Sequence, residues 1–485
     1  MQSLKILFLS AEVAPFAKAG GLADVCGALP KALAALGHEV RVVMPAYAPV
    51  EIALRTGKYG IRQHPLTLQV PMGTGPIPAG VLEATIPGSN VPVYFIAEQH
   101  RFGDRPFFYG YPDDAYRFAF FSRAALDLMI AALGWRPDVV HAHDWHTAPA
   151  VTWLATSGQY DSRFAGMPTV YTVHNLMHQG TAPWNVFHHL GVLANGLMEE
   201  RRGEVNFMAR GIYHATMIST VSPTYAREIM QREGGGGLDG LLRSRHFDVH
   251  GILNGLDYQV WNPATDAHLA ATFDADTIEL RRENKRALQR RAGLAERDDV
   301  PLVAMVTRLD FQKGLDITGH ALHLLMNHHA GEAQCVVLGA GAPQWEHMMR
   351  QLAGYHHGRM TAFIGYDPEL APLIYGGSDI FLMPSLFEPC GLGQLLAMRY
   401  GSVPVVRATG GLVDTVRDSV TGFTFSNYNA DDFWNALGKA IYIYRVDPDS
   451  WRAIQRKGMT NDYSWETSAR AYQQVYEWAI ARVRG

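Results

Sequence analysis

A pair of glycines, Gly20 and Gly21, follows the first apolar segment of the chain and precedes a helical pattern. Because glycine has no side chain, backbone amides in such a turn can approach a ligand closely, and the start of a helix attracts anions. Lys18 and Asp24 add a cation and a carboxylate to the same turn. Taken alone, this pattern is more typical of a plain turn between a strand and a helix.

Two cations, Arg308 and Lys313, lie on a second turn between a strand and a helix. A nucleoside diphosphate gains negative charge as its bond to a sugar breaks, so fixed cations and helix-end amides at that point lower the barrier. An exposed surface pair would show the same spacing and would contribute little to stability. Together, the two turns favour a site for a nucleotide sugar.

A third turn of this kind, residues 387–392, has the sequence FEPCGL. The carboxylate of Glu388 can accept hydrogen bonds from two neighbouring sugar hydroxyls, while the amides of Gly391 and Leu392 can face phosphate oxygens. Residues 409–411, TGG, supply one more amide-rich turn. A purely conformational role is the alternative, but the agreement among these turns favours binding of a phosphorylated sugar.

Apolar, β-branched segments must position these turns, and they alternate with helical patterns along the chain. The first group is KILFLSAE, EVRVVMP, PVYFIAE, DVVHAHD, TVYTVHN and MISTVS. This alternation predicts a buried parallel sheet. Parallel strands end at a common edge, so the polar residues that follow each strand are expected to gather there.

The same alternation begins again near residue 301, after a charged helical stretch that lacks such segments. We therefore expect an α/β protein with two Rossmann-like domains, residues 1–256 and 257–463. Residues 464–485 have apolar side chains at helical spacing and are predicted to form a helix that packs back on the N-terminal domain.

Bulk properties exclude several classes of protein. With 485 residues and 48% hydrophobic content, the chain exceeds what one core usually organises. A net charge of -4 without a basic run argues against nucleic-acid or membrane partners, and the 3 distant cysteines form neither a disulfide framework nor a metal site. No apolar stretch approaches the length of a membrane helix. We expect a cytoplasmic protein.

The motifs together resemble those of bacterial-type glycogen and starch synthases, the retaining glucosyltransferases of glycosyltransferase family 5. The sequences KAGGLAD, HAHDWHT, TVHN, FEPCGL and TGGL occur in that family's order and span essentially the whole chain. The resemblance implies the GT-B fold, with two Rossmann-like parallel-sheet domains facing each other across a deep interdomain cleft. It also implies that the protein transfers glucose from ADP-glucose to the non-reducing end of an α-1,4-glucan and releases ADP.

The resemblance further implies roles for the matched positions. The catalytic group would be Lys18, Asp24, Asp144, His174, Glu388 and Cys390. The substrate-binding group would be Gly20, Gly21, Asn254, Arg308, Lys313, Gly339, Tyr366, Gly391, Leu392, Thr409, Gly410 and Gly411.

Within these groups, Lys18 would lie near the phosphates or the glucan acceptor, and His174 with Asn254 would contact the donor glucose. Tyr366 would stack on the adenine. Cys390 would line the site without acting as a nucleophile. The basic pair of the second turn would neutralise the diphosphate, so neither a metal nor another cofactor is expected.

Three other interpretations stay open from the sequence. A related GT-B enzyme that forms sucrose or trehalose from UDP-glucose would share the turns. The cluster of residues 141–146, HAHDWH, could bind zinc and activate water in a hydrolase. A non-catalytic glucan-binding protein could stack sugars on exposed aromatic side chains, for which Tyr109, Tyr111 and Trp145 are the candidates.

Overall fold

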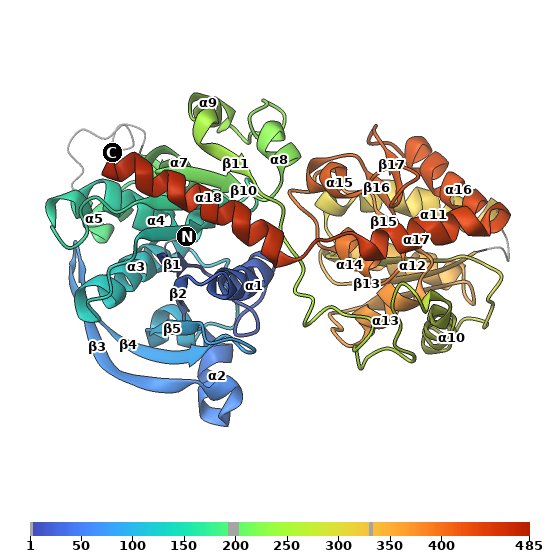
Figure 1. The fold of residues 1–485 in the computed structure, drawn as a ribbon, viewed down its shortest axis with the longest axis horizontal. Helices are drawn as coiled ribbons and strands as arrows, with labels where there is room; N and C mark the ends of the chain where they lie inside the picture. The colour runs from blue at the N-terminus through green and yellow to red at the C-terminus, as the bar shows by residue number, and fades with distance from the viewer. Residues whose placement is uncertain (1–2, 193–202, 329–332) are drawn as a thin grey trace. The chain divides into compact units, whose positions relative to one another are not determined.

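The computed structural model describes residues 3–192, 203–328 and 333–485. It separates the chain into two units, one of residues 1–255 and 465–485 and the other of residues 256–464 (Figure 1). Each unit is an α/β fold built on a largely parallel sheet. The predicted class of two Rossmann-like domains is therefore confirmed. None of the described helices combines the length and the apolar character needed to cross a membrane.

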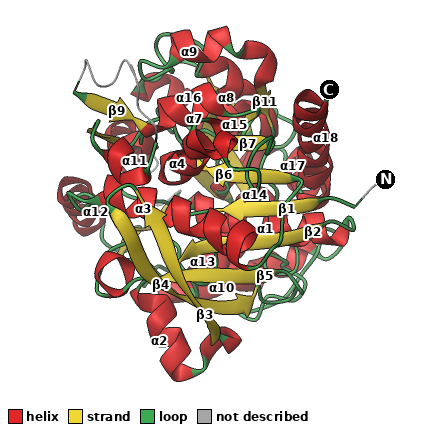
Figure 2. Cartoon of the chain, turned by 90° about the vertical axis from the view of Figure 1, so that its left-hand side faces the viewer, coloured by secondary structure: helices red, strands yellow, loops and turns green. Residues whose placement is uncertain are grey.

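In the first unit, the described strands form a nine-stranded sheet in the order β11-β10-β7-β6-β1-β2-β5-β4-β3. They are β1 (Lys5–Leu9), β2 (Glu39–Pro45), β3 (Arg62–Met72), β4 (Gly75–Thr85), β5 (Pro92–Ala97), β6 (Val139–His143), β7 (Thr169–Val173), β10 (Met217–Thr220) and β11 (Val249–Gly251). The β3–β4–β5 edge is antiparallel (Figure 2). The buried apolar segments of the sequence do not include β3 and β4, whose sequences RQHPLTLQVPM and GPIPAGVLEAT are interrupted by prolines.

The helices described in this unit surround the sheet. They are α1 (Gly21–Ala35), α2 (Ala48–Thr56), α3 (Asp114–Leu126), α4 (Asp144–Ala155), α5 (Val186–Leu190), α7 (Phe207–His214), α8 (Pro223–Glu228), α9 (Asp239–Ser244) and α18 (Trp465–Arg484). A separate small sheet pairs β8 (Thr181–Pro183) with β9 (Glu204–Asn206). The last helix, α18, packs along α1 and against β6, β7 and β10 (Figure 1). Its buried tyrosines therefore belong to the core of the first unit.

The second unit has a parallel sheet in the order β14-β13-β12-β15-β16-β17. Its strands are β12 (Leu302–Val306), β13 (Gln334–Gly339), β14 (Met360–Ile364), β15 (Ile380–Met383), β16 (Val403–Arg407) and β17 (Phe423–Phe425). Its helices are α10 (Arg281–Arg291), α11 (Leu315–His328), α12 (Pro343–Tyr355), α13 (Leu370–Gly377), α14 (Gly393–Arg399), α15 (Gly410–Thr415), α16 (Ala430–Val446) and α17 (Pro448–Thr460). Val303 and Met305 join one apolar cluster while Leu302 and Ala304 join another, so helices cover both faces.

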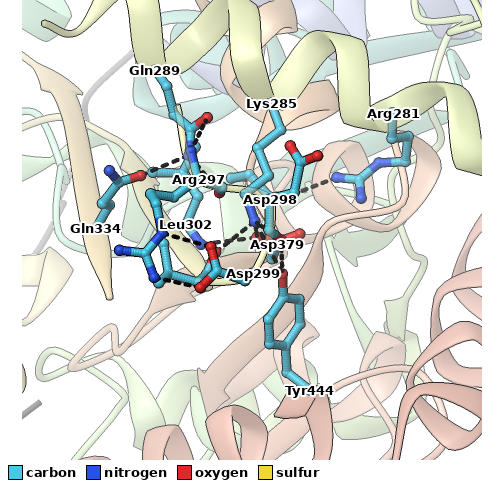
Figure 3. Close-up of polar contacts among 12 residues, drawn as sticks. Arg281, Lys285, Gln289, Arg297, Asp298, Asp299, Leu302, Gln334, Asp379 and Tyr444 are labelled. Carbon is cyan, nitrogen blue, oxygen red and sulfur yellow. Dashed lines mark hydrogen bonds and ion pairs between the residues drawn. The ribbon is translucent and has the colours of Figure 1, made fainter. Parts of the chain in front are cut away.

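A buried ion pair between Lys285 and Asp379 links α10 to this sheet (Figure 3). Lys285 Nζ lies 2.8 Å from Asp379 Oδ2, and the two side chains are 6% and 10% exposed. The ammonium also donates to the Val300 carbonyl at 2.5 Å, and the carboxylate accepts from the Leu302 amide at 2.9 Å. Leu302 begins β12 and Asp379 precedes β15. The network therefore lies at the amino ends of the strands, opposite the edge where ligands of such sheets bind.

Candidate active site

Glu12 shapes the glycine loop between β1 and α1. Its Oε2 accepts hydrogen bonds from the amides of Ala19 (2.5 Å) and Gly20 (2.9 Å), and its Oε1 accepts one from the Tyr109 hydroxyl (2.7 Å). A Cβ added at Gly20 or Gly21 would meet no atom within 4 Å, so the space over the loop is open. This space suits the predicted approach of a ligand. The sequence does not identify Glu12, which reads only as a break in an apolar segment.

Lys18 and Asp24 form an ion pair on the same loop. Their charged atoms lie 2.6 Å apart, and the side chains are 39% and 31% exposed. Burial of the carboxyl group raises the pKa of Asp24, against the opposing effect of the Lys18 ammonium. Because a partly exposed pair contributes only about 0–1 kcal/mol to stability, the ammonium can exchange this partner for an anionic ligand at little cost.

Asp144 begins α4 with a left-handed backbone, φ 56°. Such a conformation is costly for a residue with a side chain and is often found at functional sites. Its Oδ1 accepts a hydrogen bond from the backbone amide of His174 at 2.7 Å. Complete burial raises the pKa of Asp144 to about 7. Asp144, which has a strained backbone and a buried carboxyl group, thus holds the segment at the end of β7 in place.

Two histidines of the HAHDWH segment, His141 and His143, have hydrogen-bond partners inside the protein. His143 Nδ1 lies 3.0 Å from His174 Nε2. His141 lies 2.8 Å from the Tyr476 hydroxyl and 2.6 Å from the Thr172 hydroxyl. Burial lowers the pKa of all three imidazoles, that of His174 to about 3. Among the described residues, no group of three or more His, Cys, Asp or Glu side chains is placed to hold a metal ion.

Two other residues of the first unit that the sequence offers as sugar contacts differ in their surroundings. Asn254 is 7% exposed, and its Oδ1 is buried without a hydrogen-bond partner in the described part of the chain. A buried acceptor of this kind is uncommon unless a ligand completes it. Trp145, by contrast, is buried against Phe118 at a ring distance of 5.3 Å. The expectation of an exposed sugar-stacking ring is therefore wrong for Trp145, because α4 turns it into the core.

In the second unit, the predicted cation Lys313 pairs with the predicted sugar ligand Glu388. The Nζ and Oε2 atoms lie 2.7 Å apart, with the side chains 13% and 6% exposed. The Ser385 hydroxyl donates to the same oxygen at 2.9 Å. At Gly314 (φ 69°) a Cβ would lie 2.1 Å from the Pro384 carbonyl oxygen, so only glycine lets this turn pack so closely. The sequence predicts the two charges but neither their pairing nor Ser385.

Three more predicted residues follow neighbouring strands. Arg308 comes after β12 with an exposed side chain, and its guanidinium lies 3.2 Å from Asp310. Gly339 ends β13, where a Cβ would lie 2.1 Å from the Thr307 carbonyl oxygen. Tyr366 comes after β14 and is 79% exposed. Since β14, β13 and β12 are adjacent and parallel, these residues lie side by side where the strands end, at the carboxyl ends of the sheet.

Residues 409–411 support the loop that carries Glu388. The Gly411 amide donates to the carbonyl oxygens of Glu388 (3.1 Å) and Pro389 (3.2 Å). A Cβ at Gly410, whose φ is 47°, would lie 1.8 Å from the Glu388 carbonyl oxygen. The Gly411 amide, which the sequence places toward phosphate, is thus engaged by protein in the structure. Thr409, which precedes α15 as its N-cap, retains its predicted role as a hypothesis.

The rest of this loop leads into α14. Cys390 is buried, and Gly391 has a left-handed backbone with φ 74°. Leu392 is the N-cap of the helix, so the following amides point away from α14. The phosphate contacts of the Gly391 and Leu392 amides themselves stay predictions.

Sequence comparison relates both units to known proteins. The chain matches the model of the starch synthase catalytic domain over residues 5–244 and that of glycosyl transferases group 1 over residues 288–445. It is 44% identical to a glycogen synthase of Moorella thermoacetica, over 99% of this chain and 98% of that protein. It is 43% identical to a glycogen synthase of Geotalea daltonii, over 99% of each.

Structural comparison agrees with these relatives. The catalytic domain of starch synthase IV from Arabidopsis thaliana, solved with ADP and acarbose, has a TM-score of 0.88 and 34% identity, and the match covers 99% of this chain and 100% of that one. A sucrose-phosphate synthase from Thermosynechococcus elongatus has a TM-score of 0.61 at 18% identity, which shows a common fold alone.

Proposed function

The chain belongs to the glycogen and starch synthase family of glycosyltransferases, and on this premise we propose that it takes glucose from ADP-glucose to extend the non-reducing end of an α-1,4-glucan. The observation that carries this proposal is the similarity to glycogen synthases over the full length of the chain. The match spans 99% of this chain, so it extends over both sheets and the segments between their strands.

Two cations of the second unit support a diphosphate donor. Arg308 is exposed at the end of β12, and Lys313 is held 2.7 Å from Glu388. We propose that both stabilise the charge that grows on the diphosphate as its bond to the anomeric carbon breaks. Tyr366, with its exposed ring, is proposed to stack on the adenine. The Arabidopsis relative was solved with ADP, which supports the same nucleotide here.

Glu388 is proposed to hold the glucosyl unit. Its Oε2 accepts hydrogen bonds from Lys313 and Ser385, and no described residue is bonded to Oε1, which is proposed to accept from the sugar hydroxyls. A carboxylate fixed by two donors is already oriented before the sugar binds. Asn254 and His174 of the first unit are the other proposed glucose contacts, and Lys18 is proposed to contact the phosphates or the glucan acceptor.

In the proposed reaction, the 4-hydroxyl of the acceptor attacks the anomeric carbon on the face from which the diphosphate leaves. The bond from C1 to the diphosphate oxygen breaks and a bond from C1 to the glucan oxygen forms. The hydroxyl proton passes to the departing phosphate, and the configuration is retained. A double displacement would need a carboxylate nucleophile beside C1, whereas Glu388 is proposed to bind sugar hydroxyls instead.

We also propose that turnover requires no divalent metal, because Arg308 and Lys313 supply the positive charge that a metal ion would provide.

Initial rates of nucleotide release with glycogen test the donor and the metal together. We expect kcat/KM for ADP-glucose to exceed that for UDP-glucose by at least about tenfold, a difference of 1.4 kcal/mol, and to be unchanged by a chelator. Sucrose or trehalose formation from UDP-glucose, or activity lost to the chelator and restored by a metal ion, would contradict the proposal.

A further inference from the structure

His143 lies directly behind the proposed sugar ligand His174. It ends β6, and it pairs in register with Thr172 of the neighbouring β7, whose end leads to His174. The His143 Nδ1 and His174 Nε2 atoms are 3.0 Å apart. One of the two imidazoles must therefore donate a hydrogen bond to the other.

The His143 ring has a fixed orientation. It stacks on Phe8 with a centroid distance of 5.2 Å and an interplanar angle of 23°. On another side it packs against His141, 4.0 Å away. His141 is itself held by the hydroxyls of Tyr476 and Thr172. The nitrogen of His143 that faces His174 thus has a defined direction.

The surroundings of His143 determine which ring donates. Burial keeps both imidazoles neutral, so each carries one proton. His143 Nε2 is buried and finds no partner among the residues that the structure describes. A buried N–H without an acceptor is rarer and costs more than an unpaired acceptor nitrogen. The proton of His143 therefore lies on Nδ1, which donates a hydrogen bond to His174 Nε2.

This arrangement also sets the proton of His174. Because its Nε2 is an acceptor, its single proton must lie on Nδ1. No side chain or backbone group within the described ranges is hydrogen-bonded to that Nδ1, while the His174 amide is held by Asp144. The ring thus presents a donor to a ligand.

We propose that His143 is a positioning residue for glucosyl transfer, which holds His174 as the Nδ1–H tautomer so that His174 donates a hydrogen bond to an oxygen of the donor sugar. The part about the sugar rests on the proposed function, whereas the tautomer depends only on the structure of the first unit.

Two substitutions of His143 separate the two possible tautomers of His174. In His143→Asn the side-chain amide nitrogen takes the place of Nδ1 and still donates. In His143→Asp an oxygen takes that place and accepts, which moves the His174 proton to Nε2. His143→Leu replaces the aspartate variant if that protein does not fold, and it should give a mixture of His174 tautomers. His146→Phe is the matched control, since His146 is also buried, with 6% of its surface exposed, and packs on Phe118.

Nitrogen-15 NMR of the full chain labelled in histidine reports the tautomer, with the His174 signals identified by their loss in His174→Gln. We expect an Nδ1 proton in the wild-type, His143→Asn and His146→Phe proteins and an Nε2 proton in His143→Asp. Turnover should fall by about 100-fold in His143→Asp, as for loss of one positioned donor, and by no more than about fivefold in His143→Asn.

An Nε2 proton on His174 in the wild-type protein would overturn the proposal, and so would equal turnover in the asparagine and aspartate variants. If the wild-type protein shows the Nδ1 proton but transfers no glucose, the proposed function fails while the tautomer assignment holds.

Discussion

Replacing Lys313 with methionine separates the catalytic role of its ion pair from the structural one. At 2.7 Å and an effective dielectric constant of about 20, the Coulomb attraction to Glu388 is roughly 6 kcal/mol. The cost of removing both charges from water offsets most of this attraction. Loss of one partner leaves the other charge buried, which typically lowers the free energy of unfolding by about 3–5 kcal/mol. We expect the lower end, about 3 kcal/mol, because the Ser385 hydroxyl still donates to the carboxylate.

The double variant Lys313→Met, Glu388→Gln removes both charges and so leaves neither uncompensated. Its free energy of unfolding should return to within about 1 kcal/mol of the wild-type value. Turnover should not return, because each charge is expected to act in the transition state. Each single variant should lose about 10²–10³ in kcat, and the double variant should be no more active than the worse single one.

Urea unfolding followed by tryptophan fluorescence measures stability, and the initial rate of ADP release measures turnover. Ser385→Ala is the matched control: it removes the other hydrogen bond to the same carboxylate oxygen and leaves both charges in place. If the double variant recovers turnover together with stability, the pair serves only to hold the loop, and the reasoning is refuted.

Three further changes test other parts of the structure. Glu12→Gln keeps an oxygen for the Ala19 and Gly20 amides but directs its NH2 group at the Tyr109 hydroxyl, so that hydrogen bond must reverse and the negative charge that strengthens all of them is lost; stability should fall by about 1–3 kcal/mol, and steady-state kinetics should show a larger effect on the donor KM than on kcat. Lys285→Met removes the ion-pair partner of Asp379 far from the candidate site, while the Leu302 amide still donates to that carboxylate, so urea unfolding should show a loss of about 3 kcal/mol with kcat within about twofold, and a larger fall in kcat would contradict that separation. Because burial raises the pKa of Asp144 to about 7, the folded state binds this proton more tightly, and the resulting stabilisation is present at acidic pH and is lost as the pH rises through about 7. Asp144→Asn removes this pH dependence of the free energy of unfolding. The free energy of unfolding of the variant, minus that of the wild type, should therefore rise between about pH 5 and about pH 8. A difference that stays constant over this range would count against the raised pKa.

Most of the fold is predictable from the sequence because strands buried on both faces appear as apolar segments. KILFL and LVAMV, which become β1 and β12, show this directly. The β3–β4 hairpin is not predictable in the same way, since prolines at positions 65, 71, 76 and 78 read as breaks. Proline is tolerated there because β3 is the edge strand of the sheet, and because Pro76 and Pro78 precede the part of β4 that pairs with β5.

The candidate site is predictable as a set of positions but not as a set of contacts. Strand ends identify Arg308, Tyr366 and Glu388 because parallel strands end at one edge. The pairing of Lys313 with Glu388 spans 75 residues and that of Tyr109 with Glu12 spans 97, and both depend on how loops pack in three dimensions. Periodicity in the sequence carries no information about such pairings.

We claim that this chain adds glucose to an α-glucan with retention of configuration. NMR of the product formed from maltohexaose and ADP-glucose labelled with carbon-13 at C1 tests this. We predict maltoheptaose with the label in a new α-1,4 linkage at the non-reducing end, and one ADP released for each glucosyl unit transferred. A β-linked product, labelled free glucose in place of chain extension, or a labelled disaccharide such as trehalose would contradict the claim.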